Sequence, residues 1–254
     1  MGVRQRSQPL SSAPFRWDSA TTTHPGKVRE INEDAALALP ERGLWVVADG
    51  MGGHEAGDMA SNMIVESLSG VKAHDNPADF LDEVEDRLLD VNLSLYETAN
   101  NSVLMRTIGS TVVALLVMGR HTVIVWAGDS RAYRLRDGEL QRLTVDHSQV
   151  EVMVQAGELR REDAESHPLS NVITRAVGGT DELYLDVDLR ELIDGDRYLL
   201  CSDGLYKDLD EDSLAASLGS GTCAEACQAL LDLALAGEAS DNITAAVIDF
   251  RGNG

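Results

Sequence analysis

The stretch LWVVADGMGGH, residues 44–54, places a single carboxylate between an apolar run and a turn rich in glycine. The apolar run, residues 44–48, is typical of a buried strand, and Asp49 stands at its end. Gly50, Gly52 and Gly53 then take side chains away from the turn, so the backbone there can approach a neighbouring group closely. The stretch therefore predicts a buried strand that carries a charge to the edge of a sheet.

The same pattern of an aspartate beside an apolar strand recurs along the chain. Asp129 and Asp203 end apolar runs in VIVWAGDSR and RYLLCSDGL, and Asp241 comes just before the last strand in SDNITAAVI. Strands of one core tend to present their ends at shared edges, so these side chains are expected to converge with Asp49. Asp-Gly is also a turn signal in its own right, which explains any single aspartate better than it explains the set.

Converging carboxylates repel one another, so a buried group of them needs a compensating partner. One solution is a shared proton, as in aspartic proteases, but the Asp-Thr/Ser-Gly pair of those enzymes does not match ADG, GDS and SDG here. The other solution is a metal site. Ligands that are all oxygen favour Mg²⁺ or Mn²⁺ over Zn²⁺, so the pattern indicates a hard divalent cation.

The overall composition limits the partners and the location of the chain. With 254 residues and a net charge of −22, the chain is a poor partner for a nucleic acid or an anionic membrane. No apolar run approaches the roughly 20 residues of a membrane span, and the N-terminal residues lack the apolar stretch of a signal peptide. Three cysteines are too few for a disulfide scaffold. We expect a monomer in the cytoplasm.

The chain is expected to form one domain of strands and helices. Residues 1–15 are predicted to be a flexible tail and residues 16–254 a single domain, in which the charged segment 146–180 is a surface excursion. The short links GRH and RDGE make their flanking strands antiparallel neighbours. This order of elements predicts an α+β fold of antiparallel sheets covered by helices. Strands are expected at 34–39, 44–48, 109–118, 122–128, 131–136, 139–143, 183–190, 196–202 and 243–250, and helices at 55–69, 77–100, 148–156, 210–218 and 222–236.

An ordered set of short motifs, spread over about residues 24 to 250, resembles the metal-dependent serine/threonine protein phosphatases of the PPM (PP2C) type in their compact bacterial form. The resemblance implies a four-layer α-β-β-α sandwich, two antiparallel sheets flanked by helices. It also implies hydrolysis of phosphoserine and phosphothreonine in proteins by direct attack of a water that bridges two metal ions. The motifs are REINED (29–34), VVADGMGGH (46–54), GST (109–111), WAGDSR (126–131), LTVDHS (143–148), ITRAVGG (173–179), LLCSDGL (199–205) and SDNITAAV (240–247).

Carried over position by position, the resemblance implies a metal-binding role for five residues. Asp49 bridges two divalent ions, Mn²⁺ or Mg²⁺, and the Gly50 carbonyl helps to hold one of them. Asp203 and Asp241 bind the other ion. Asp129 matches the position that, together with Asp203, holds a third metal in bacterial members.

The REINED motif supplies the remaining groups. Glu33 and Asp34 match acids that act through metal-bound waters, and Arg29 matches the arginine that grips the phosphate. An arginine fork suits a tetrahedral dianion better than a lysine does. Outside this motif, Arg29 could equally form a surface salt bridge, and the two acids could cap a turn.

The proton donor departs from the pattern of the animal members, which carry a histidine directly after Asp-Gly. That histidine is proposed to protonate the leaving serine oxygen. Met51 occupies the position here, and His54 follows three residues later. The donor is therefore open between His54 and a metal-bound water.

Two rival functions stay in view. A thiol phosphatase is suggested by Cys201 and Lys207 in CSDGLYK, but Asp203 would then lie beside the phosphate, and the cysteine follows two leucines on a strand. A catalytically weak relative that keeps the fold for binding or regulation is the second, although such proteins usually lose metal-binding acids. Thr111, Ser130 and Thr244 are expected to be packing hydroxyls, because they show no Gly-x-Ser-x-Gly or Ser-His-Asp arrangement.

The expected partners are phosphorylated proteins, the targets of a bacterial serine/threonine kinase. The excursion at 146–180 matches the family's flap beside the active site and is expected to affect substrate choice more than chemistry. A role in type VI secretion is suggested by likeness to that group of the family, and no single residue demonstrates it.

Overall fold

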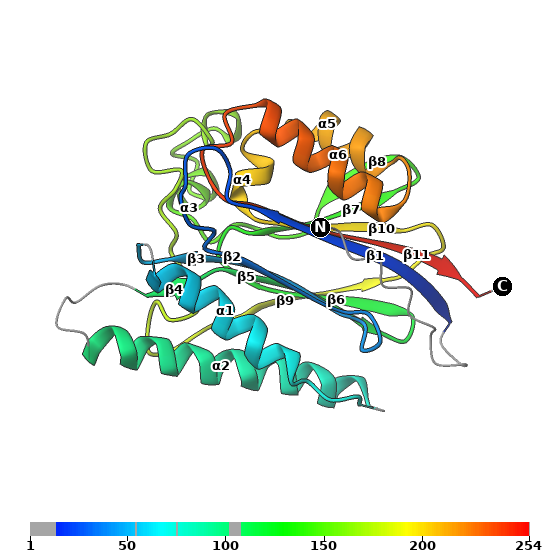
Figure 1. Cartoon of the computed structure of the whole chain (residues 1–254), viewed down its shortest axis with the longest axis horizontal. Helices are drawn as coiled ribbons and strands as arrows, with labels where there is room; N and C mark the ends of the chain where they lie inside the picture. The colour runs from blue at the N-terminus through cyan, green and yellow to red at the C-terminus, as the bar shows by residue number, and fades with distance from the viewer. Residues whose placement is uncertain (1–13, 54, 75, 102–107, 254) are drawn as a thin grey trace.

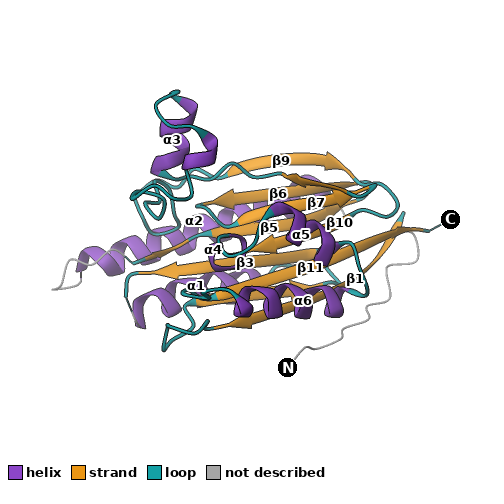
Figure 2. Cartoon of the chain, turned by 90° about the horizontal axis from the view of Figure 1, so that it is seen from above, coloured by secondary structure: helices purple, strands orange, loops and turns teal. Residues whose placement is uncertain are grey.

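Two antiparallel sheets stack face to face in the structure, a computed structural model that describes residues 14–53, 55–74, 76–101 and 108–253 (Figures 1 and 2). One sheet has the strand order β1-β11-β10-β7-β8. The other has the order β2-β3-β5-β6-β9, with the short β4 beside β3. The strands are β1 (Phe15–His24), β2 (Asp34–Leu39), β3 (Leu44–Met51), β4 (Gly109–Ser110), β5 (Val112–Met118), β6 (His121–Ala127), β7 (Arg131–Arg136), β8 (Glu139–Arg142), β9 (Asp186–Glu191), β10 (Arg197–Cys201) and β11 (Ile243–Gly252).

Helices cover the outer face of each sheet. The helices α1 and α2 lie on the β2-β3-β5-β6-β9 sheet, and α5 and α6 lie on the other sheet (Figure 1). The predicted four-layer α-β-β-α arrangement is confirmed. The helices are α1 (Glu55–Ser69), α2 (Pro77–Asn101), α3 (Gln149–Gln155), α4 (Asp203–Tyr206), α5 (Glu211–Leu218) and α6 (Cys223–Ala236), and a 3₁₀ turn spans Arg161–Asp163.

The strand quoted first, β3, is buried on both faces because it lies between two apolar layers. Leu44, Val46 and Ala48 pack under the helices. Trp45 and Val47 point the other way, into the layer between the two sheets. All five side chains are fully buried, which explains why this strand is apolar throughout and does not alternate with polar residues.

The first strand, β1, was not expected from the sequence. It pairs with β11 along its whole length, from Phe15 opposite Gly252 to His24 opposite Ile243. Its sequence, FRWDSATTTH, is too polar to predict a core strand, and its burial comes from α6 over Ala20 on one face and from the layer between the sheets, which holds Phe15, on the other. Phe15 is buried in this strand and does not belong to a tail, and residues 1–13 lie outside the described residues.

Four further details differ from the expected elements. The predicted strand 109–118 is divided at Thr111 into β4 and β5. β4 pairs with the end of β3, whereas β5 pairs with the first part of β3 and with β6. The strand β3 continues through Gly50 and Met51, so the glycine turn begins only at Gly52. The strand β9 begins at Asp186, not at residue 183, and the short helix α4 was not predicted.

The short links behave in two ways. GRH and RDGE join antiparallel neighbours, β5 to β6 and β7 to β8, as predicted. The equally short link from β6 to β7 crosses from one sheet to the other, and it carries Asp129 to the edge where both sheets end.

Among the described residues, no helix combines the length and the apolar character that crossing a bilayer requires. The expected cytoplasmic location stays a prediction.

Candidate metal centre

The predicted acids come from strand ends that meet at one edge of the sandwich. Asp49 lies in β3 and faces Asp34 of β2 across the antiparallel register. Asp129 lies in the link from β6 to β7. Asp203 opens α4 directly after β10, and Asp241 stands two residues before β11. Both sheets therefore contribute carboxylates to the same edge.

The combined charge of these acids acts on Asp49. Burial raises the pKa of Asp49 well above its ordinary value, and the charges of Asp34, Asp203, Asp129 and Asp241 raise it further, in that order. A carboxylate in such surroundings is stable as an anion only when a cation lies beside it. The fold therefore places carboxylates at this edge that need a cation beside them to remain charged.

Two of the acids have a buried oxygen with no partner. Oδ1 of Asp34 and Oδ1 of Asp129 accept no hydrogen bond from any described residue. Burial raises the pKa of Asp34 to about 7, against a 2.7 Å hydrogen bond from Ser202 Oγ to Asp34 Oδ2. Burial and the charge of Asp203 raise the pKa of Asp129 to about 7 as well. Buried polar atoms are usually satisfied, so these oxygens point to a proton or a cation close to them.

The two more open acids are paired with cationic side chains of the chain. Arg29 Nη2 donates to Asp241 Oδ2 at 2.9 Å. Lys207 Nζ donates to Asp203 Oδ2 at 2.5 Å. Within the described ranges, no group of three or more His, Cys, Asp or Glu side chains is arranged to hold a metal ion as it stands. Binding of ions at Asp203 and Asp241 therefore requires these two pairs to open or to share oxygens with the ions.

A cavity of about 330 Å³ lies over the acids. Asp49, Asp203 and Asp241 line it, and Arg29 lines it with them. Asn171, from the flap segment (residues 146–180), lines it as well. A water molecule occupies about 30 Å³ in the liquid, so the cavity has room for several ions and waters together with a phosphoryl group.

Gly50 is required because three backbone segments meet there. A Cβ atom at this residue would lie 2.0 Å from the carbonyl oxygen of Gly57 and 2.7 Å from that of Glu33. The Gly50 N–H donates to the same Glu33 oxygen at 3.1 Å. The absent side chain lets the loop before β2 and the helix α1 close on the end of β3.

The residues present fit a pair of hard divalent ions. The acids and the Gly50 carbonyl that line the described part of the site offer carboxylate and carbonyl oxygens, which form the donor set of Mg²⁺ and Mn²⁺. The unpaired Oδ1 atoms of Asp34 and Asp129 and the raised pKa of Asp49 agree with a site that binds cations.

Asn242, which the sequence analysis did not single out, fixes the loop that carries Arg29 and Glu33. Its Oδ1 accepts from the Glu33 N–H at 2.7 Å. Its Nδ2 donates to the carbonyl oxygens of Pro25 and Ile31, each at 3.0 Å. The side chain is buried. Its place directly after a site aspartate was the only sign of this role in the sequence.

The hydroxyls that were expected to pack do so. Thr111 Oγ1 lies 2.7 Å from Ser130 Oγ and accepts from the Asp49 N–H at 3.1 Å. Thr244 Oγ1 lies 2.7 Å from Thr23 Oγ1. Thr111, Ser130 and Thr244 are buried and hydrogen-bonded, so they are support for the strand ends and not nucleophiles.

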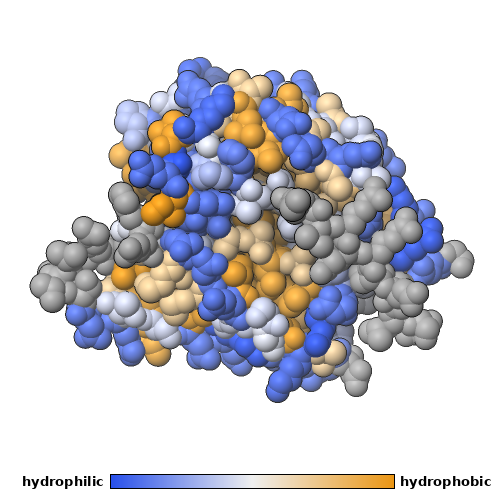
Figure 3. Space-filling view, in the orientation of Figure 1, coloured by the Kyte–Doolittle hydropathy of each residue, from blue (hydrophilic) through white to orange (hydrophobic). Residues whose placement is uncertain are grey.

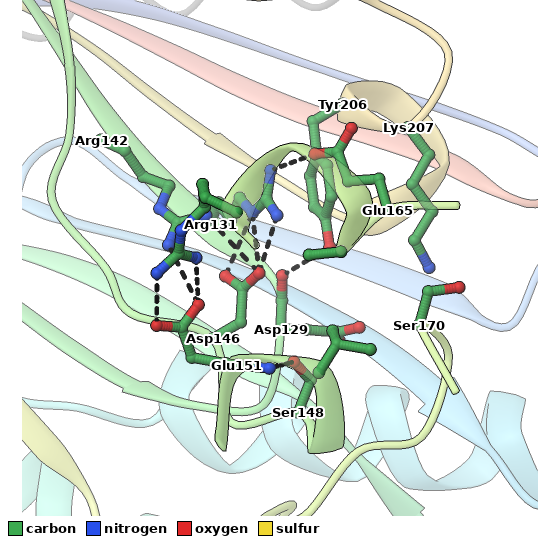
Figure 4. Close-up of a pocket in the computed structure, with 13 residues that line it drawn as sticks. Asp129, Arg131, Arg142, Asp146, Ser148, Glu151, Glu165, Ser170, Tyr206 and Lys207 are labelled. Atoms are coloured by element: carbon green, nitrogen blue, oxygen red, sulfur yellow. Dashed lines mark hydrogen bonds and ion pairs between the residues drawn. The ribbon is translucent and has the colours of Figure 1, made fainter. Parts of the chain in front are cut away.

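Side chains around a second, smaller pocket connect the flap segment to the sheet (Figure 4). Arg131 of β7 donates to both oxygens of Asp146, with Nε–Oδ1 at 3.0 Å and Nη2–Oδ2 at 2.7 Å. Its guanidinium lies 3.5 Å above the centre of the Tyr206 ring. Arg161 forms an ion pair with Glu151 of α3. The helix α3 confirms the helix that the sequence predicted within this segment.

The structure argues against a thiol phosphatase with Cys201 as the nucleophile. Cys201 lies in the middle of the sheet with none of its surface exposed. Burial raises the pKa of its thiol to about 12, so the nucleophilic thiolate is not formed at neutral pH. Cys223 and Cys227 are buried too, and each thiol faces a backbone oxygen of β1.

His54, the candidate proton donor, lies outside the described residues. Met51, which occupies the position of the animal histidine, lines the cavity over the acids. Glu33 lines that cavity as well, and its carboxylate lies against the backbone of Gly57.

Comparison with known proteins agrees with this geometry. Residues 26–231 match the family model described as protein phosphatase 2C. A serine/threonine phosphatase, Stp, of Listeria monocytogenes is 33% identical over 245 residues, which cover 93% of this chain and 95% of the relative. PstP of Mycobacterium tuberculosis, a serine/threonine protein phosphatase, is 36% identical over 224 residues. That alignment covers 88% of this chain and 43% of PstP, so the chain spans less than half the length of this relative.

Solved structures extend the likeness to three dimensions. PppA, a key regulatory component of T6SS in Pseudomonas aeruginosa, is 40% identical with a TM-score of 0.84, and the match covers 93% of this chain and 97% of PppA. The catalytic domain of PstP in complex with two manganese ions is 33% identical with a TM-score of 0.83, covering 93% and 99% of the two chains. From the family model, the relatives and the shared sandwich together, the chain belongs to the protein phosphatase 2C family.

Proposed function

We propose that this chain hydrolyses phosphoserine and phosphothreonine in proteins at a centre of two divalent metal ions, Mn²⁺ or Mg²⁺. Asp49, the Gly50 carbonyl, Asp203 and Asp241 would hold these ions. All of these groups come from a single chain, so the site is complete in a monomer. The expected partners are proteins phosphorylated by a serine/threonine kinase.

One observation carries this proposal. Burial, and then the charges of four other aspartates at the end of the sandwich, raise the pKa of Asp49, which lines a cavity together with Arg29. An acidic cluster of this kind needs bound cations, and an arginine at its rim supplies a group for an anionic substrate. Relatives named as serine/threonine phosphatases support the choice of substrate.

The protein groups have distinct tasks in this proposal. Two divalent ions, when bound, lower the pKa of a water and neutralise the phosphoryl oxygens. Asp34 and Glu33 orient waters around the centre, and Ser202 holds Asp34 through the hydrogen bond to its Oδ2. Arg29 binds the phosphate with its guanidinium fork. His54 is one proposed candidate for the group that donates a proton to the leaving serine oxygen.

The proposal is tested by hydrolysis of a phosphothreonine peptide during a Mn²⁺ titration. Activity should be absent after chelation, return with Mn²⁺, and be lost in Asp203→Asn and Asp241→Asn together with metal affinity. Asp90→Asn is the matched control, because Asp90 lies on the exposed face of α2 and should leave both unchanged. Full activity of both site variants would contradict the two-metal assignment.

A catalytically weak member that binds or regulates partners is the alternative. It predicts a folded wild-type protein that shows no Mn²⁺-dependent hydrolysis of any phosphopeptide. The site acids are all present, which favours the enzyme.

The pathway is proposed from likeness alone. PppA is described as a key regulatory component of T6SS, and a role of this chain in type VI secretion is our proposal by extension. Phosphoproteomics of a deletion strain tests it: phosphorylation should rise on secretion components if the proposal is correct, and only on other proteins if it is not.

A further inference from the structure

Lys207 lies one helical turn after Asp203, at the end of α4. Its Nζ donates to Asp203 Oδ2 at 2.5 Å and to Asn171 Oδ1 at 2.6 Å. The Lys207 side chain is 27% exposed, and the Asp203 side chain is 16% exposed. The ammonium is therefore held between an acid of the metal centre and the flap segment.

The charge of the Lys207 ammonium also influences acids other than Asp203. Its charge interacts favourably with Asp129 and with Asp49 as well as with Asp203. Lys207 and Asp129 line the same pocket, one from α4 and the other from the link between the sheets (Figure 4). Lys207 thus lies beside the two carboxylates that the resemblance assigns to a third metal.

We propose that the Lys207 ammonium is the permanent cation for Asp129 and Asp203, so that this chain binds two divalent ions and no third one. The inference rests on the proposed two-metal function. It departs from the third ion that the sequence led us to expect at Asp129.

The surroundings of Lys207 disfavour a metal ion there. A hard divalent cation takes about six or more oxygen ligands, whereas the other two buried acids of the pocket beside Asp129, Asp146 and Glu151, are already paired with Arg131 and Arg161. The ammonium already takes Asp203 Oδ2 as its acceptor. A second cation at this place would repel Lys207 and leave it without a carboxylate partner.

The same contact has a consequence for the centre and the flap segment. Holding Oδ2 fixes the orientation of the Asp203 carboxylate, so Oδ1 is the oxygen left for a metal ion. The bond to Asn171 joins the flap segment to that carboxylate. Lys207 is therefore a positioning residue that adds its charge to the centre at every metal concentration.

The number of bound ions tests the inference. Native mass spectrometry and elemental analysis at saturating Mn²⁺ should give two ions per wild-type chain. Lys207→Asp removes the ammonium and places a carboxylate next to Asp129 and Asp203, so this variant should bind three. Lys207→Met removes the charge without adding a ligand and checks that loss of the lysine leaves the fold and the first two ions in place. Lys72→Asp, at an exposed position, is the matched control and should stay at two.

Each result is decisive. Three ions on the wild-type protein, or two on a folded Lys207→Asp variant, overturn the assignment to Lys207. Fewer than two ions on the wild-type protein overturn the two-metal centre itself, which is a failure of the proposed function and is distinguishable from the first. The wild-type count needs no variant, so the inference stays testable even if a substitution prevents folding.

Discussion

The Arg29 guanidinium donates to the Asp241 carboxylate at 2.9 Å, although the two residues lie 212 positions apart in the chain. Arg29 is the proposed phosphate-binding group, and Asp241 is a proposed metal ligand. Their side chains are 50% and 40% exposed, and exposed pairs of this kind contribute only about 0–1 kcal/mol. The pair can therefore be exchanged for a metal ion on one side and a phosphate on the other.

Replacement of Arg29 should weaken substrate binding more than it weakens the fold. A hydrogen bond to a charged group contributes about 1.5–3 kcal/mol, so Arg29→Ala should lower kcat/KM for a phosphopeptide by roughly 10- to 100-fold, mainly through KM. Arg29→Lys should recover part of the loss, because it keeps the charge without the fork. Steady-state kinetics measures this, with Arg16→Ala, an exposed position outside the flap segment, as control. Wild-type kcat/KM in Arg29→Ala would remove the phosphate role.

The stability of the metal-free protein should fall as the pH rises from about 4 to about 7. The folded pKa of Asp129 is about 7, above its ordinary value near 4. The folded state therefore holds the proton more tightly than the unfolded state, so the stability from this group is complete below pH 4 and is lost towards pH 7. The expected slope is roughly 1.4 kcal/mol per pH unit for each such group.

Urea denaturation across this pH range checks the prediction. Asp129→Asn should flatten the curve relative to the wild type, because its amide does not titrate. Mn²⁺ binding near pH 6 should release protons from the acids of the site, which calorimetry in buffers of different ionisation enthalpy detects. Identical pH slopes for the wild type and Asp129→Asn would show that this carboxyl has no raised pKa.

Loss of the Arg131 guanidinium should destabilise the protein and detach the flap segment. Both Arg131 and Asp146 are only 9% exposed, and breaking a buried ion pair by removing one partner costs about 3–5 kcal/mol. Arg131→Met should show this loss in urea denaturation. The double variant Arg131→Met/Asp146→Leu should recover part of it, since no buried charge is left unpaired. Arg160→Met is the exposed control, and an equal loss there would contradict the argument.

Cys201→Ala should keep the activity of the folded enzyme. The thiol is fully buried with a pKa of about 12, so its removal should cost only about 1–2 kcal/mol of stability by leaving a small cavity. Phosphopeptide hydrolysis per folded molecule, with Mn²⁺ present, is the measurement. An inactive variant that still binds two metal ions would return the thiol mechanism to consideration.

The parts of the fold that the sequence predicted share one property: their signal is local. The strand ending at Asp49 has an unbroken apolar run, and the predicted helices have apolar residues at helical spacing. β1 was missed because its burial depends on the layer between the sheets and on α6, whose cysteines approach it from more than 200 positions away. The break at Thr111 was missed because β4 and β5 pair with different stretches of sequence.

The sequence by itself determined the strand and helix pattern and the aspartates placed at strand ends, because neighbouring residues set both. Only the tertiary structure decided which cation faces which acid. Arg29 meets Asp241, Lys207 meets Asp203 with Asn171, and Asn242 holds the loop before β2. Charge interactions and hydrogen bonds depend on distance in space, and that distance is fixed only when two sheets from remote parts of the chain close on one edge.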